Sequence, residues 1–143
     1  MTKLLGALLV IVFLLLLLTF IREPHRVIFL NAPTISPVEN FTYRTERPMR
    51  VSIDYDQMII VPRHFDTDLA SIPRIFWAIL PPQQANFVAP AVLHDYMYTK
   101  HIESRKYADD VLYAGLRAQG AMWITANIIW LGVRLGGGIH YAK

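Results

Sequence analysis

The chain opens with a long uncharged apolar run, LLGALLVIVFLLLLLTFI, from Leu4 to Ile21. Eighteen residues of helix extend roughly 27 Å, close to the ~30 Å hydrocarbon core of a bilayer. A cleaved secretory signal is the alternative, but its apolar region usually has ~7–15 residues and small residues at the cleavage site. Here the run ends in TFIREP, which has no small-x-small pattern before the polar segment, so a cleaved signal is disfavoured. It predicts a single-pass N-terminal membrane anchor over residues 1–22, with the side of the membrane left open because positive charges flank both ends.

The composition of the remaining chain narrows the classes of function. About 120 residues follow the run, enough for one domain with a modest core. The sequence has no cysteine, which excludes disulfides and thiolate metal sites. Lysine and arginine are scattered without a basic stripe, so we expect no nucleic-acid partner. The net charge of +3 suits attraction to anionic lipid headgroups, and we expect membrane lipid as a partner.

The middle of the chain predicts a linker followed by a β-hairpin. Residues 23–47 hold several prolines and no sustained period, with one short strand expected over Val27–Leu30. Apolar and polar residues then alternate over residues 51–55, and a second apolar run covers residues 58–61. Asp56-Gln57 between the two runs suits a hairpin turn.

The second half of the chain predicts helices. A short helix is expected after Ser71, and the next begins at Ala89 so that Pro90 falls in its first turn. Another begins after the N-cap residue Ser104 and ends near Gly120. An apolar helix over residues 121–133 follows; its 13 uncharged residues are too few to cross a membrane.

These elements predict an α+β fold in which helices dominate. We expect an N-terminal transmembrane helix, a short β-hairpin, a pair of antiparallel helices and a C-terminal helix. The corresponding division is an anchor over residues 1–22, a linker over 23–47 and a globular domain over 48–143.

Two neighbouring aspartates on the helix after Ser104 are predicted to have different surroundings. Asp109 shares a helical stripe with three apolar residues at i+3, i+4 and i+7, whereas Asp110 shares its stripe with Arg117. Asp109 therefore faces the core and Asp110 faces solvent. A buried carboxylate needs a partner, and His94 on the preceding helix is the nearest inward-facing basic group. The sequence predicts a His94–Asp109 hydrogen bond, which is either a catalytic dyad or a structural tie between two helices.

Further residues suggest other kinds of site, namely a Ca²⁺ site, a metal phosphohydrolase and a serine nucleophile. Asp68, in a loop, and Asp95 would contribute to an all-oxygen site that suits a hard cation such as Ca²⁺. A metal phosphohydrolase that adds His64 to His94, Asp95 and Asp109 is an alternative. Ser71 as a nucleophile is another, although no glycine elbow surrounds it.

Four motifs in order carry a resemblance to known proteins: TDLAS at 67–71, HDYMY at 94–98, RKYADDVL at 105–112 and GVRLGG at 132–137. This order resembles that of bacterial phospholipase A2, in which an acidic loop precedes an H-D-x-x-Y helix. The chain is also similar, over about residues 48–141, to an uncharacterised family of small proteins common in phage and prophage genomes. That family carries T-D-x-A-S-I-P-R, H-D-x-x-Y and R-x-x-A-D.

The phospholipase resemblance implies a role for each matching residue. His94 would be the general base, Asp109 its orienting partner, and Tyr98 would hydrogen-bond to Asp109. The residues implied as Ca²⁺ ligands are Asp68, Asp95 and the backbone carbonyl near Leu69.

The expected function is therefore a membrane-anchored phospholipase A2-like domain that hydrolyses phospholipid esters with Ca²⁺. The apolar segment IPRIFWAIL at 72–80 would serve either as an interfacial lip or as ordinary core. The alternative is a non-catalytic phage or prophage membrane protein that uses the same fold to bind a phage or host membrane protein.

Overall fold

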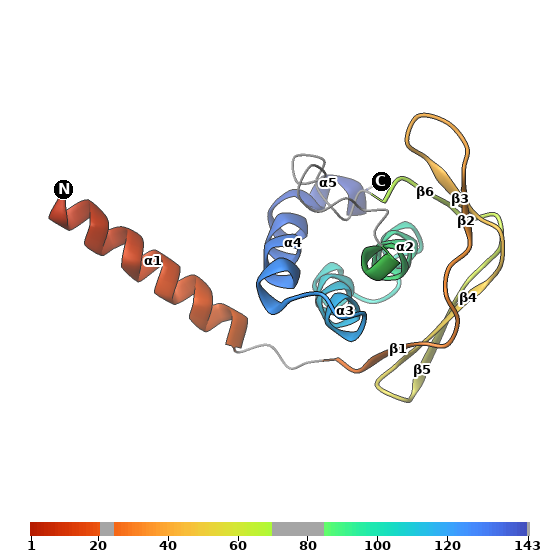
Figure 1. Cartoon of the computed structure of the whole chain (residues 1–143), viewed down its shortest axis with the longest axis horizontal. Coiled ribbons are helices and arrows are strands. Elements are labelled where there is room, and N and C mark those ends of the chain that lie inside the picture. The colour runs from red at the N-terminus through yellow and green to blue at the C-terminus, as the bar shows by residue number, and fades with distance from the viewer. Residues whose placement is uncertain (21–24, 70–84, 143) are drawn as a thin grey trace.

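The computed structural model describes residues 1–20, 25–69 and 85–142. An N-terminal helix, α1 (Thr2–Phe20), projects away from the rest of the chain, and the strands lie on the opposite side of the central helices (Figure 1). Within the described residues after α1, two small antiparallel sheets precede three longer helices and one short helix.

The first sheet forms because apolar residues alternate along its strands. It comprises β1 (Val27–Phe29), β4 (Met49–Ile53) and β5 (Gln57–Val61), in the order β1-β4-β5. Every second residue of β4 and β5 points into the core, so the inner face is buried while Met58 and Ile60 are exposed. The residues that form this inner face are Met49, Val51, Ile53, Ile59 and Val61.

The second sheet places a short acidic strand near the helices. It comprises β2 (Ile35–Pro37), β3 (Tyr43–Thr45) and β6 (Asp66–Thr67), in the order β2-β3-β6. Buried Thr45 fixes the chain that leads into β6. Its Oγ1 donates to the Pro62 carbonyl at 2.8 Å and accepts from the Phe65 amide at 2.9 Å.

Four helices follow the sheets: α2 (Ala85–Thr99), α3 (Arg105–Ala118), α4 (Trp123–Gly136) and α5 (Gly138–Tyr141). Among these described helices, α2 and α3 pack on the inner face of the first sheet, and α4 packs on α3. The α3 helix begins as expected, because Ser104 Oγ accepts a hydrogen bond from the Tyr107 amide at 3.1 Å. Gly115 marks where β1, α2 and α3 converge. A Cβ there would lie 3.2 Å from Phe29 Cζ and 3.4 Å from Pro90 Cβ.

The predicted membrane anchor is wrong. Thr2 and Lys3 begin α1, so only residues 4–20 of this helix are apolar, fewer than the roughly 20 that a span takes. Residues 21 and 22 of the predicted anchor lie outside the described residues. Across residues 1–20, 25–69 and 85–142, no helix has the combined length and apolarity needed to cross a membrane. The single-pass localisation and the transmembrane part of the fold class are corrected accordingly.

The rest of the predicted fold class also needs correction. The β4–β5 hairpin is present, but segment 23–47 contributes β1, β2 and β3, so two sheets replace one hairpin. Short strands interrupted by prolines carry too little periodicity to be recognised alone. The α2 helix begins at Ala85 and encloses Pro90, whose missing N–H removes only one helical hydrogen bond. The helix expected after Ser71 and the segment 72–80 lie outside the described residues.

Replacing Gly115 with leucine should destabilise the fold by roughly 1–3 kcal/mol, because the added side chain has to displace Phe29 and Pro90. The matched change Gly136→Leu should cost little, since a Cβ added at Gly136 would meet no atom within 4 Å. Urea unfolding of both variants measures the difference. Equal losses would show that the three elements do not converge at Gly115.

Candidate functional site

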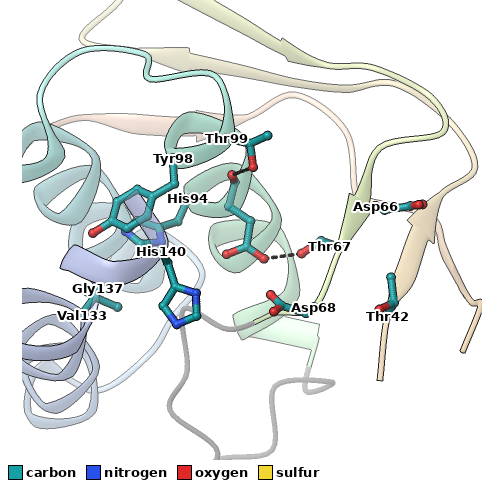
Figure 2. Close-up of a pocket in the computed structure, with 11 residues that line it drawn as sticks. Thr42, Asp66, Thr67, Asp68, His94, Tyr98, Thr99, Val133, Gly137 and His140 are labelled. Atoms are coloured by element: carbon teal, nitrogen blue, oxygen red, sulfur yellow. Dashed lines mark hydrogen bonds between the residues drawn. The ribbon is translucent and has the colours of Figure 1, made fainter. Parts of the chain in front are cut away.

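A pocket of about 320 Å³ opens between the second sheet, α2 and the α4–α5 junction (Figure 2). Most of the described residues that line it have polar side chains, which include carboxylates, hydroxyls and two imidazoles. The described residues that line it are Thr42, Asp66, Thr67, Asp68, His94, Asp95, Tyr98, Thr99, Val133, Gly137 and His140.

Behind the pocket, Asp109 lies at the centre of a buried hydrogen-bond network. Its side chain is 0% exposed, and that of His94 is 2% exposed. Asp109 Oδ1 accepts from His94 Nε2 at 2.7 Å and from the Tyr98 hydroxyl at 2.5 Å. Asp109 Oδ2 accepts from Arg134 Nη1 at 2.7 Å. The His94–Asp109 and Tyr98–Asp109 hydrogen bonds expected from the sequence are therefore present; the chemical roles of these residues stay predictions.

The network keeps Asp109 ionised despite its burial. Burial by itself raises the pKa of this carboxyl, but hydrogen bonds from His94, Tyr98 and Arg134 outweigh it and hold the pKa below its ordinary value. Burial, together with the hydrogen bond to Asp109, raises the pKa of the Tyr98 phenol well above its ordinary range. Tyr98 therefore remains a hydrogen-bond donor to a negatively charged carboxylate at neutral pH.

The hydrogen bond to Asp109 orients the His94 imidazole. Because Asp109 is ionised and can only accept, Nε2 carries the hydrogen and donates. The basic lone pair then belongs to Nδ1, and His94 also lines the pocket. Its ring packs against that of Tyr98 with the centroids 4.1 Å apart, which fixes the imidazole plane. An imidazole held this way by a carboxylate is the arrangement of a general base.

Two arginines complete this network, and the sequence analysis did not identify either of them as part of the site. Arg134 comes from α4, and Arg105 Nη2 donates to the Val133 carbonyl at 2.9 Å and also to the Arg134 carbonyl. Arg105 Nε lies 3.9 Å from Asp109 Oδ2. Arg105 thus joins α3 to the C-terminal end of α4 and places Arg134 beside Asp109. The sequence did contain a sign that Arg134 has a special role, because it is the single charged residue in the mostly apolar segment 121–138.

The loop after β6 is held against α2 by hydrogen bonds. Thr67 Oγ1 donates to Asp95 Oδ2 and accepts from the Leu69 amide at 3.1 Å. Leu69 is fully buried and has a φ of 54°, a left-handed conformation that is unusual for a branched residue. Such backbone strain persists only where the surroundings enforce it, and it concentrates at functional sites.

The residues predicted to hold Ca²⁺ are brought only partly together. Asp68 and Asp95 both line the pocket and offer the oxygen chemistry that suits Ca²⁺, whereas the Leu69 side chain is buried in the core. Ca²⁺ takes roughly 6–8 oxygen ligands. Within the residues that the structure describes, no group of three or more His, Cys, Asp or Glu side chains could hold a metal. The oxygen donors of Asp68 and Asp95 suit a hard cation, but they are fewer than the roughly 6–8 ligands that Ca²⁺ takes.

The prediction that Asp110 faces solvent is wrong. Asp110 is only 9% exposed and accepts from Lys106 Nζ at 2.6 Å and from Trp130 Nε1 at 2.9 Å. The indole of α4 covers this side of α3, which the periodicity of α3 alone could not reveal.

Two residues from the alternative hypotheses are not brought to the site. His64 is exposed and is not among the described residues that line the pocket, which leaves the phosphohydrolase set incomplete. Ser71 lies outside the described residues. The sequence analysis in turn missed Thr42, Thr67 and His140, which lie in or beside short elements without a recognisable period.

A model of the family described as Protein of unknown function (DUF1353) matches residues 43–133, more than half of the 143-residue chain. The chain belongs to the DUF1353 family. The matched region runs from β3 into α4 and contains His94 and Asp109, whereas Arg134 and His140 follow it. The comparisons with curated proteins and with solved structures found no match. Membership of the DUF1353 family leaves the activity open.

Asp109→Asn should destabilise the fold by about 3–5 kcal/mol, because it leaves the partly buried Arg134 without its carboxylate. Asp110→Asn on the same helix is the matched control and should cost less, since Lys106 is mostly exposed.

The stability that Asp109 contributes should depend on pH. The Asp109 pKa is lowered in the fold, so its contribution to stability is present above the unfolded pKa of about 3.9 and is lost as the pH falls through the folded pKa.

Urea unfolding of the wild type and both variants at neutral pH and below about pH 4 measures these effects. The cost of Asp109→Asn should shrink in acid. A cost that does not change with pH would contradict an ionised Asp109.

Proposed function

We propose that the pocket hydrolyses carboxylic esters by means of a water activated by His94. The observation that carries the proposal is the 2.7 Å hydrogen bond from His94 Nε2 to the buried Asp109 carboxylate, on a histidine that also lines a pocket. A base and its orienting carboxylate are thus combined with room for a substrate.

The proposed reaction uses only residues of this chain. His94 Nδ1 accepts a proton from water while the water oxygen attacks the carbonyl carbon, and the π electrons of the carbonyl move to its oxygen. The tetrahedral intermediate then re-forms the C=O bond and expels the alcohol oxygen, which takes up a proton. The products are a carboxylic acid and an alcohol. Asp109 stabilises the imidazolium that forms on His94, and Tyr98 and Arg134 keep Asp109 in place.

The pocket favours this reaction over a purely structural tie between two helices. A tie needs only the buried His94–Asp109 contact. Here the same histidine lines a cavity of about 320 Å³, within the range of small-molecule sites, and Asp68 and Asp95 line it too. Leu69, which directly follows the lining residue Asp68, has a strained backbone, and such strain is compatible with the same interpretation.

Phospholipid acyl esters are the substrate class to test first. The basis is the resemblance, carried by motifs at 67–71, 94–98, 105–112 and 132–137, to bacterial phospholipase A2 and to the phage and prophage family. That resemblance is part of the proposal and not a result of the comparisons. The hydrogen bonds from His94 and Tyr98 to Asp109 are compatible with it.

Calcium is a separate part of the proposal. Asp68, Asp95 and the carbonyl of Leu69 would be its ligands, and no step of the proposed reaction is routed through it. Bound Ca²⁺ would supply positive charge beside a developing oxyanion.

His94→Gln should lower ester hydrolysis by the full chain about 100-fold or more, because the amide cannot accept a proton from water. His64→Asn is the matched control, since His64 is exposed, is not among the described residues that line the pocket, and has a φ of 65° that asparagine tolerates. The measurement is release of fatty acid from phospholipid in mixed micelles, with urea unfolding as a check on folding. A folded wild type that cleaves no ester would favour the non-catalytic alternative, in which the pocket binds a partner.

Asp68→Asn should weaken Ca²⁺ binding about tenfold or more, because it removes one anionic ligand from the pocket. Asp56→Asn, in the exposed β4–β5 turn, is the control and should leave the affinity unchanged. Isothermal titration calorimetry with CaCl₂ measures both. Absence of binding by the wild type would remove calcium from the proposal and leave the His94 reaction intact.

A further inference from the structure

The short helix α5 is fixed at the edge of the pocket by close backbone packing. Gly137 lies so near Tyr98 that a Cβ there would be 2.8 Å from the Tyr98 hydroxyl and closer still to the Val133 carbonyl oxygen. Only glycine permits this approach. The same Tyr98 hydroxyl donates to Asp109, so α5 packs directly on the side chain that supports the proposed dyad.

Contacts at the other end of α5 hold it in place. The Tyr141 carbonyl accepts from His101 Nε2 at 2.7 Å, and the Tyr141 hydroxyl donates to the Glu103 carbonyl at 3.1 Å. The Tyr141 ring also packs edge-on against Tyr98, with centroids 5.2 Å apart. A single helical turn is not stable alone, so these contacts, and not the turn itself, determine where α5 lies.

This anchoring places His140 in the pocket. Figure 2 shows the His140 side chain among the residues that line the pocket. His94 and His140 are the two imidazoles among the described residues that line the pocket. They differ in burial, since His94 is buried and His140 is exposed. The other titratable groups of the lining are Asp66 and Asp68 from the β6 region and Asp95 and Tyr98 from α2.

We propose that His140 is the general acid of the site, a proposal that rests on the proposed ester hydrolysis. The protonated His140 imidazole donates its proton to the alcohol oxygen as the C–O bond of the tetrahedral intermediate breaks. His94 meanwhile holds the proton taken from water. After the products leave, His94 releases that proton to solvent and His140 takes one up, so atoms and charge balance over the cycle. Imidazole suits this role because it exchanges protons near neutral pH.

The leaving group of the substrate distinguishes this role from a structural one. An alkoxide needs a proton to depart, whereas p-nitrophenolate departs as a stable anion. The test compares an alkyl ester and a p-nitrophenyl ester of the same short-chain acid, with the full-length wild type, His140→Gln, His94→Gln and the control His64→Asn.

His140→Gln should lower kcat/KM for the alkyl ester about 100-fold and leave the p-nitrophenyl ester within a few-fold of wild type. His94→Gln should lower the hydrolysis of both esters, and His64→Asn should change neither. Since His140 is exposed, its replacement is expected to leave the urea unfolding curve unchanged.

The other outcomes separate the two proposals. If His140→Gln lowers both esters equally or neither, while His94→Gln lowers both, the general-acid role is wrong and ester hydrolysis by His94 stands. If His94→Gln lowers neither ester, or the wild type cleaves neither, the proposed function fails and the role of His140 fails with it.

Discussion

The buried carboxylate of Asp109 is the group on which the helical part of this protein depends. It lies on α3 and accepts hydrogen bonds from His94 and Tyr98 of α2 and from Arg134 of α4. A carboxylate taken out of water is costly unless its lone pairs are satisfied, so these three helices have to meet at one point. The burial of the Asp109 carboxylate therefore determines both how these helices pack and where the charges of the site lie.

The pocket follows from that meeting point. His94, held by Asp109, also lines the cavity between α2, β6 and the α4–α5 junction. Thr67 holds the β6 loop against α2 by donating a hydrogen bond to Asp95. Both proposed proton-transfer groups thus depend on Tyr98, which donates to Asp109 and packs against Gly137 and Tyr141 of the α5 region.

The sequence predicted a feature correctly where the residues of a single helix were sufficient to determine it. The spacing of Asp109 along α3 predicted its burial, and Ser104 marked the start of that helix. It failed where a second element decided the outcome. Asp110 is covered by Trp130 of α4, and in segment 23–47, where only one strand was expected, β1 and β3 pair with β4 and β6 from later in the chain. The apolar N-terminal run was also misjudged, since the described helix falls short of a span.

The sequence by itself determined that an inward-facing aspartate on one helix would need a histidine partner on its neighbour. Helical periodicity and the cost of burying a charge are local rules, and they were sufficient for that pair. The tertiary structure alone decided that Arg134 joins the pair and that His140 enters the pocket. Both residues follow the region matched to the DUF1353 family, and their positions depend on contacts across 25 or more residues, such as those of Arg134 with Asp109 and Tyr141 with His101. No local pattern encodes contacts of that range, because they exist only once the helices have packed.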